Sequence, residues 1–240
     1  EYCLTLEGPG SCIGDTQCIN LTVNQTPELS AMTGTGEYCE GEDVLLTTDN
    51  TATGTGDLDY ICIGPDGFEQ SGTIAEDEEI MLDLPNITLD QAGTYTCTVT
   101  SAAGCTDEVS GAITVNAVPT IVNQDPGGND GSYCEGETIT LSAENDVEDV
   151  GQLTYTWTGP NGFEFTDTVN EDEPFTATIP NATIGDSGAY CLTVVSDADC
   201  GSDEVCVDVV VNPNPIVTLS GGGEFCEDEI AVLTATIDLN

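Results

Sequence analysis

The stretch YCEGE at residues 38–42 recurs as YCEGE at residues 133–137 and as FCEDE at residues 225–229. The first two copies begin 95 residues apart, and the last two begin 92 residues apart. This period matches the length of one small β domain, and repetition at a fixed period is the sequence signature of a repeat array. The motif therefore predicts that the chain consists of successive copies of one domain.

Two further motifs keep the same 95-residue step. GPDGFE at residues 64–69 returns as GPNGFE at 159–164, and LPNIT at 84–88 returns as IPNAT at 179–183. The Pro-Asx-Gly step in the first motif supplies residues that tolerate positive φ in a tight hairpin turn. Conserved spacing between these turns indicates that the copies share one strand order.

Short runs of alternating apolar and polar residues lie between these landmarks. Val44 and Leu46 belong to one run, and Tyr60 and Cys62 belong to the next. A period of two is typical of β-strands that bury one face. About seven such strands in about 95 residues predict an all-β fold in which two sheets pack as a sandwich.

The alignment of the copies also predicts where domains begin and end. Residues 1–24 align without a gap on residues 189–212, and short proline-bearing linkers separate the copies. Linkers of this kind favour a stiff, linear arrangement of domains. We expect the C-terminal part of one domain at residues 1–26, whole domains at 27–117 and 118–213, and the N-terminal part of another at 214–240.

The composition excludes several classes of function. The 240 residues include no Lys, Arg or His against 45 Asp plus Glu, which gives a formal net charge of -45. Such a surface repels nucleic acid and anionic lipid. No apolar run approaches the roughly 20 residues needed to span a bilayer. Carboxylates are the only strong acid–base groups left, so we expect no enzyme, no nucleic-acid partner and no membrane insertion.

The cysteines indicate disulfides rather than a metal site. The chain has 12 cysteines but no histidine and no Cys-x-x-Cys pair, which disfavours zinc. Disulfides persist in oxidising compartments. We therefore expect an extracellular or cell-surface location.

Several motifs resemble those of immunoglobulin domains. DSGAY at residues 186–190 resembles the Asp-x-Gly-x-Tyr corner that precedes strand F, and Trp157 sits where such domains place their strand C tryptophan. More narrowly, YCEGE, a GPNGF turn, Gly-x-Tyr, a late Cys and a closing VNP resemble the Ig-like repeats of giant secreted surface proteins of Bacteroidota. These include adhesins exported by the type IX system and linked to gliding. The resemblance implies tandem immunoglobulin-like sandwiches in a linear array.

Comparison of the repeats predicts how the cysteines pair. Cysteines present in both whole domains at equivalent positions should form a shared bond, and the remaining cysteines then pair by elimination. The expected bonds are Cys39–Cys105, Cys134–Cys200, Cys62–Cys97, Cys191–Cys206 and, by alignment, Cys3–Cys18. Cys12 and Cys226 would pair outside residues 1–240. The alternative is an immunoglobulin-like Cys39–Cys97 bond.

Two equivalent acidic runs are candidate cation sites. They comprise Glu76, Asp77 and Glu78 in one domain and Glu171, Asp172 and Glu173 in the other. Carboxylate oxygens are suitable ligands for Ca²⁺ or Mg²⁺, but no calcium-loop motif is present. The alternative is a solvated edge whose charge blocks sheet-to-sheet aggregation. We expect no other cofactor.

Five positions are candidates for glycosylation. Four fit the N-glycosylation sequon, and one, in Asp-Thr-Val, resembles the short O-glycosylation signal of Bacteroidota. The candidates are Asn20, Asn24, Asn86, Asn181 and Thr168. The alternative for Asn86 and Asn181 is a turn asparagine followed by a strand threonine.

The sequence favours a structural and adhesive role in a long, extracellular, disulfide-stapled and polyanionic fibre or stalk. The expected partners are neighbouring domains of the same chain, further copies of the fibre, and a glycan or cell-surface partner. The alternative is a binding module that recognises a glycan or a protein through loops at one end of the sandwich. For that role the only candidate loop aromatics are Phe68 and Phe163.

Overall fold

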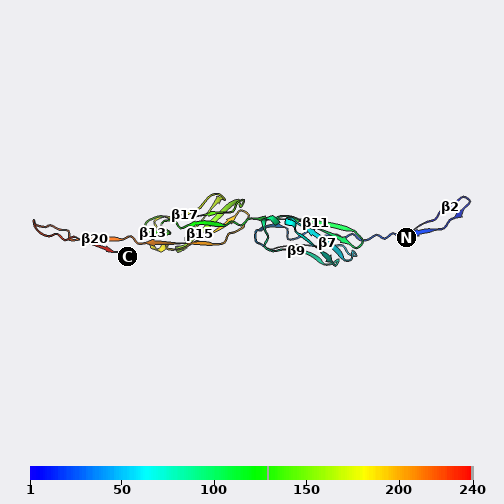
Figure 1. The fold of residues 1–240 in the computed structure, drawn as a ribbon, viewed down its shortest axis with the longest axis horizontal. Coiled ribbons are helices and arrows are strands. Elements are labelled where there is room, and N and C mark those ends of the chain that lie inside the picture. Colours follow the sequence, from blue (N-terminus) through cyan, green and yellow to red (C-terminus); the bar gives the residue numbers. More distant parts are fainter. Residues whose placement is uncertain (129, 239–240) are drawn as a thin grey trace. The chain divides into compact units, whose positions relative to one another are not determined.

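The computed structural model describes residues 1–128 and 130–238 (Figure 1). The chain divides into two compact units, Glu1–Val115 and Asn116–Asn240, and each is described by itself. The regular secondary structure of both units consists of β-strands and single turns of 3-10 helix.

The elements of the first unit follow in chain order: β1 (Tyr2–Leu4), β2 (Glu7–Gly8), β3 (Cys12–Ile13), β4 (Gln17–Ile19), β5 (Gly36–Cys39), β6 (Val44–Asp49), β7 (Leu58–Ile63), η1 (Pro65–Gly67), β8 (Glu69–Ile74), β9 (Glu79–Leu84), η2 (Leu89–Gln91), β10 (Gly93–Ser101) and β11 (Thr106–Asn116).

The elements of the second unit are β12 (Ile121–Asp125), β13 (Ser132–Cys134), β14 (Ile139–Asn145), β15 (Gln152–Thr158), η3 (Pro160–Gly162), β16 (Glu164–Asn170), β17 (Phe175–Ile179), η4 (Ile184–Asp186), β18 (Gly188–Ser196), β19 (Val205–Asn212), β20 (Ile216–Ser220) and β21 (Thr234–Asp238).

In the first unit, two sheets enclose one apolar core. One sheet has the strand order β5-β11-β10-β7-β8, and the other pairs β6 with β9. Antiparallel bridges from Leu29 to Asn50 and from Thr33 to Thr47 extend the smaller sheet. Burial alternates along β6, where Val44 and Leu46 are buried, so the predicted period of two is confirmed.

The second unit repeats this arrangement with one extra strand. Its sheets have the orders β13-β19-β18-β15-β16 and β12-β14-β17. Trp157 on β15 is fully buried in the core between them, and its Nε1–H has no hydrogen-bond partner among the described residues. The all-β sandwich predicted from the sequence is confirmed.

The Pro-Asx-Gly steps form the turns that the sequence predicts. Each is a single 3-10 turn between two paired strands, η1 between β7 and β8 and η3 between β15 and β16. Asp66 has φ 52° and Asn161 has φ 56°, the left-handed region that these short polar residues tolerate.

The segments on either side of the two sandwiches form exposed hairpins. All of residues 1–26 are exposed, including Ile13 and Val23, and β1 pairs with β4 while β2 pairs with β3. β20 and β21 form a similar antiparallel pair after the second sandwich. The predicted domain boundaries stay predictions.

Candidate functional site

A buried tyrosine near the start of β10 and of β18 donates a hydrogen bond that fixes the turn before it. The hydroxyl of Tyr95 donates a hydrogen bond to the main-chain oxygen of Gln91 at 3.0 Å, and that of Tyr190 donates to the oxygen of Asp186 at 2.9 Å. Both side chains are fully buried. Burial, with the nearby Asp186 carboxylate, raises the pKa of Tyr190 to about 12, so this hydroxyl stays a donor at neutral pH.

The Gly-Pro-Asx-Gly-Phe turn packs on this tyrosine. A Cβ built on Gly159 would lie 2.4 Å from Cδ1 of Tyr190, and one on Gly64 would lie 2.5 Å from Cδ1 of Tyr95. Only glycine fits at such a contact. The two repeated motifs therefore form one packed unit, which explains why they recur together.

The phenylalanines that end this turn contact the same tyrosines. The ring of Phe163 lies edge-on to Tyr190 with centroids 5.6 Å apart, and Phe68 lies likewise against Tyr95 at 5.3 Å. This edge-to-face geometry stabilises aromatic pairs. Phe68 and Phe163, the aromatics considered for ligand binding, thus pack against the domain that carries them.

The turn before each tyrosine is closed by a capping box. In the second unit, a carboxylate oxygen of Asp186 accepts hydrogen bonds from the backbone N–H and the hydroxyl of Thr183, both at 2.8 Å. In the first unit, the neutral amide of Gln91 accepts the N–H of Thr88 at 2.9 Å. The backbone N–H and hydroxyl of Thr183, with Asn161, lower the pKa of Asp186.

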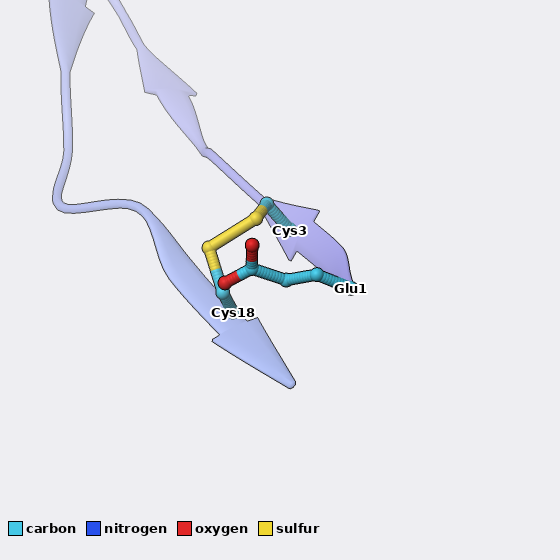
Figure 2. A group of neighbouring side chains, drawn as sticks. All are labelled: Glu1, Cys3 and Cys18. Carbon is cyan, nitrogen blue, oxygen red and sulfur yellow. A yellow bond between two sulfur atoms is a disulfide. The ribbon is translucent and has the colours of Figure 1, made fainter. Parts of the chain in front are cut away.

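Three of the predicted cysteine pairs are disulfide-bonded in the structure: Cys3–Cys18, Cys62–Cys97 and Cys191–Cys206. Each joins residues that are directly opposite on neighbouring antiparallel strands. Figure 2 shows the Cys3–Cys18 bond between β1 and β4. Cys62 and Cys97 lie inside the sandwich, whereas Cys3 and Cys18 are exposed.

The predicted bonds Cys39–Cys105 and Cys134–Cys200 are wrong. Cys105 and Cys134 are free thiols, whereas Cys39 and Cys200 are each disulfide-bonded. The alternative Cys39–Cys97 bond is also wrong, because Cys97 bonds to Cys62.

The predicted bond between Cys134 and Cys200 cannot form, because the two cysteines lie at opposite ends of β19. Cys134 is in register with Asn212, the last residue of β19, whereas Cys200 precedes the first residue of that strand, Val205. β19 has eight residues, which at ~3.3 Å each separate its ends by roughly 25 Å. A disulfide needs Cα atoms within about 7 Å. Cys12 and Cys226 are free and exposed, and their pairing outside the chain stays a prediction.

The first glutamate of each acidic run anchors a loop of its own domain. The carboxylate of Glu76 accepts the N–H groups of Gly54 and Gly56 at 2.9 and 3.1 Å. Glu171, 95 residues later, accepts those of Val150 and Gly151 at 2.8 and 3.1 Å. The N–H of Gly56, assisted by those of Gly54 and Thr55, lowers the pKa of Glu76.

The last glutamate of each run closes a tight turn. Glu78 accepts the N–H of Ala75 at 3.1 Å, and Glu173 accepts that of Asn170 at 3.2 Å. Asp77 and Asp172 lie between these anchors. Among the described residues, these six carboxylates form no close group of three possible metal ligands. The two groups of that kind are Glu1 with Cys3 and Cys18, and Glu204 with Cys191 and Cys206. Disulfide sulfur is no thiolate ligand.

The second unit gathers its acidic run around a hollow of about 370 Å³. Glu171, Asp172 and Glu173 line it together with three acids that were not predicted from the sequence, Glu144, Asp146 and Glu148. The run ENDVEDV at residues 144–150 is the sequence signal that could have found them. Carboxylates from the end of β14, from the segment that follows it and from the β16–β17 connection are thereby brought to one place.

The candidate glycosylation positions lie on the surface. Asn86 and Asn181 are exposed turn residues with φ 48° and 55°, and Asn20 and Asn24 are exposed too. Thr168 is exposed in the middle of β16, where its Oγ1 lies 3.0 Å from that of Thr154. Modification at these positions stays a prediction.

Comparison with solved structures identifies the fold of the sandwiches. A titin I-band fragment, I67-I69, matches with a TM-score of 0.53 and 15% identity, over 89% of this chain and 77% of that one. A marsupial T cell receptor matches with a TM-score of 0.50 and 16% identity, over 80% of this chain and 76% of the receptor chain. The domains have the immunoglobulin-like fold.

At this level of identity the likeness establishes the fold alone. An E-to-A variant of the same titin domains matches with a TM-score of 0.52 and 16% identity, over 88% of this chain and 76% of that one. No family of known proteins matches the sequence, and no curated protein sequence matches it either. The immunoglobulin-like resemblance seen in the sequence is thus confirmed.

In the part of the chain that the structure describes, no helix has the length and apolar character to cross a membrane.

Proposed function

We propose that this chain is a segment of a long extracellular fibre or stalk made of tandem immunoglobulin-like domains. The observation that carries the proposal is the succession of two complete sandwiches at a 95-residue step, each cross-linked internally by a disulfide. β11 ends at Asn116 and β12 begins at Ile121, so only four residues, one of them Pro119, connect the two sandwiches. A short, proline-bearing connection limits bending between domains.

The chemistry of the chain fits exposure outside the cell. Disulfides persist in oxidising compartments, and the absence of Lys and Arg removes every cleavage site of a trypsin-like protease. The joint sequence pattern supports a place among the giant secreted surface proteins and adhesins of Bacteroidota. Neighbouring domains of the same chain, other copies of the fibre and a cell-surface partner are the contacts that this role requires.

Like charge is the second element of the proposal. With a formal charge of -45 and no basic side chain, neighbouring fibres repel one another unless counterions screen or bridge them. The hollow lined by Glu144, Asp146, Glu148 and the 171–173 run is where Ca²⁺ or Mg²⁺ would bind. Divalent cations would then regulate how fibres associate.

The alternative role is recognition of a glycan or a protein through the sandwich loops. Its aromatic candidates, Phe68 and Phe163, are engaged with the buried tyrosines. A glycan array probed with the 240-residue chain tests this role, and specific binding to a glycan class would favour it over the purely structural one.

The fibre proposal is tested on cells that produce the protein. Antibodies against the 240-residue chain, visualised by immunogold electron microscopy, should label filaments that project from the cell surface. A strain lacking the gene serves as the control and should lose both the label and the filaments. Label confined to the cell interior, or filaments unchanged in the deletion strain, would contradict the proposal.

A further inference from the structure

Two hairpins of this chain place a pair of directly opposed cysteines near the surface. On β18 and β19, Cys191 lies opposite Cys206, and on β1 and β4, Cys3 lies opposite Cys18. The two pairs occupy the same positions of the repeat. Cys206, Cys3 and Cys18 are exposed, and Cys191 is half-buried, whereas the disulfide between β7 and β10 is fully buried. The hairpin disulfides are therefore accessible to reagents in solution.

A glutamate lies beside each pair, two residues before one of its cysteines. Glu204 precedes Cys206, and Glu1 precedes Cys3. Residues two apart on an extended strand point to the same face. In each hairpin, a carboxylate oxygen and both sulfur atoms lie within 4.8 Å of one another. Figure 2 shows this arrangement for Glu1, Cys3 and Cys18.

We propose that each of these hairpins is a site for a thiophilic divalent cation such as Zn²⁺, and that the disulfide closes the site. When the bond is reduced, two thiolates and one carboxylate become available as ligands, which in the second unit are Cys191, Cys206 and Glu204. Water completes the tetrahedral coordination of Zn²⁺. Thiolates are soft ligands, so the site selects Zn²⁺ over Ca²⁺ or Mg²⁺.

The backbone keeps the two thiols within reach of one cation after reduction. The Cα atoms of Cys191 and Cys206 are 4.0 Å apart, and the pairing of neighbours such as Tyr190 with Val207 holds the two strands in register. Zn–S bonds of about 2.3 Å allow two sulfur atoms to lie as much as roughly 4.6 Å apart. Rotation of the cysteine side chains is therefore enough to bind the cation, and no strand has to move.

The sandwich does not need a covalent bond at this place. At the equivalent positions of the first sandwich, β10 and β11 oppose Thr96 to Ser110, whose hydroxyl oxygens are 2.8 Å apart. That sandwich forms its five-stranded sheet with a hydrogen bond where the second sandwich has a disulfide. Reduction of the bond between Cys191 and Cys206 should therefore leave the second sandwich folded.

The charge of the chain favours a cation at these hairpins. Two thiolates and one carboxylate carry three negative charges, and a divalent cation compensates two of them. The chain has no Lys, Arg or His and a formal charge of -45, so no basic side chain competes for the carboxylate. A surface of one sign also raises the local concentration of ions of the opposite sign.

Opening the site takes two electrons and two protons. A dithiol, such as that of an exported oxidoreductase, supplies them: the S–S bond between the two cysteines breaks, two S–H bonds form, and the reductant becomes a disulfide. Zn²⁺ then displaces the two thiol protons as it binds. This inference does not depend on the fibre role, because it concerns each hairpin by itself.

Titration of the 240-residue chain with Co²⁺, a spectroscopic probe for Zn²⁺ sites, tests the proposal. The disulfides are reduced with a phosphine, because a dithiol would itself bind the metal, and oxygen is excluded. We expect thiolate-to-cobalt charge-transfer absorption that saturates at two Co²⁺ per reduced chain and is absent from the oxidised chain. Added Zn²⁺ should abolish this absorption. A reduced chain that shows no such absorption would overturn the proposal.

Paired serine variants show which cysteines bind the metal. Cys191→Ser/Cys206→Ser and Cys3→Ser/Cys18→Ser should each retain one bound Co²⁺, and the chain with all four substitutions should retain none. A serine pair resembles the hydroxyl pair of the first sandwich, so these variants should fold, which circular dichroism checks. Charge-transfer absorption that persists with all four substitutions would place the metal on other cysteines and contradict the proposal.

A matched pair of single variants tests the carboxylate ligand in the Cys3→Ser/Cys18→Ser chain. Asp208 lies two residues after Cys206, as Glu204 lies two residues before it, but among the described residues Asp208 does not belong to the close group. Glu204→Gln should weaken Zn²⁺ binding by roughly tenfold or more, since losing a ligand costs at least as much as losing a residue that only orients one. Asp208→Asn should have little effect. Equal effects of the two variants would mean that the carboxylate is no ligand and would overturn the proposed site.

Discussion

Cys62 on β7 and Cys97 on β10 lie directly opposite each other and are joined by a disulfide within the core of the first sandwich. In the second sandwich the same register opposes Trp157 to Leu192, both fully buried. One domain thus connects its two central strands by a covalent bond, and the other fills the same place with a large apolar pair. This difference predicts that only the first domain depends on a disulfide between these two strands.

Removing the buried disulfide should destabilise the first sandwich alone. In Cys62→Ala/Cys97→Ala, loss of a bond that closes a 35-residue separation should lower the free energy of unfolding by about 4 kcal/mol. Calorimetry of the 240-residue chain should show one of its two transitions shifted down by roughly 15 °C or more.

The matched control removes a disulfide from the other domain. Cys191→Ala/Cys206→Ala opens a 15-residue separation on the second sandwich, with an expected loss of about 3 kcal/mol. This variant should lower the temperature of the unfolding transition that Cys62→Ala/Cys97→Ala leaves unchanged. A shift of both transitions by either variant would contradict independent cores.

The contact between Gly159 and Tyr190 should not accept a methyl group. Because a Cβ at position 159 would overlap the tyrosine ring, Gly159→Ala should lower the stability of the second sandwich by about 1–3 kcal/mol. Denaturant unfolding with Tyr and Trp fluorescence measures this loss. Gly201→Ala is the control, since its Cβ would meet only ordinary contacts at 3.8 Å, and it should cost much less. Equal losses would show that ring overlap is not the cause.

The capping carboxylate of Asp186 should make the second sandwich sensitive to acid. Its pKa is lowered in the folded state, so its contribution is present above its ordinary pKa near 4 and is lost as pH falls through the folded value. Asp186→Asn should therefore cost roughly 0.5–1 kcal/mol at pH 7, a modest amount because the group is near solvent.

The test compares thermal unfolding of the wild type and the variant at pH 7 and near pH 2.5. The difference between them should shrink at the lower pH. Gln91→Ala provides a neutral control at the equivalent cap of the first sandwich, and its cost should not change with pH. A difference for Asp186→Asn that is constant from pH 7 to 2.5 would contradict the role of the charge.

Most of the fold could be predicted from the repeated motifs. Alternation placed Val44 and Leu46 in the core, and the Gly-x-Tyr pattern predicted the corner formed by Tyr190. These features are local, so a short stretch of sequence contains the whole signal. Directly opposed cysteines such as Cys191 and Cys206 also followed from repeat comparison.

Four other cysteines, Cys39, Cys105, Cys134 and Cys200, could not be assigned in the same way. Equivalence between Cys39 and Cys134, and between Cys105 and Cys200, shows that each pair has one role, but it does not say at which end of the sandwich each member lies. That depends on β13 lying parallel to β19, a long-range pairing absent from the local pattern. The anchoring role of Glu76 was hidden for the same reason, because its partners, Gly54 and Gly56, lie across a loop.

Added salt should stabilise both sandwiches, whereas calcium should stabilise the second sandwich more than the first. With no basic side chain to offset 45 acids, screening by NaCl reduces repulsion throughout the chain, so both unfolding temperatures should rise with ionic strength. Six acids line the hollow of the second sandwich, and the first has Thr51 and Thr53 where the second has Asp146 and Glu148. At equal ionic strength, CaCl₂ should therefore raise the second transition more than NaCl does, and a chelator should reverse the gain.

The variant that checks this is Glu148→Gln/Asp172→Asn, which lowers the charge of the hollow without touching Glu171 and its hydrogen bonds to Val150 and Gly151. This variant should abolish the additional rise in the unfolding temperature of the second sandwich that calcium produces. The rise produced by NaCl should remain, because screening acts on the whole chain whereas coordination would act at one site. Identical responses of the two sandwiches to CaCl₂ and NaCl would mean that the acids of the hollow are ordinary surface charge.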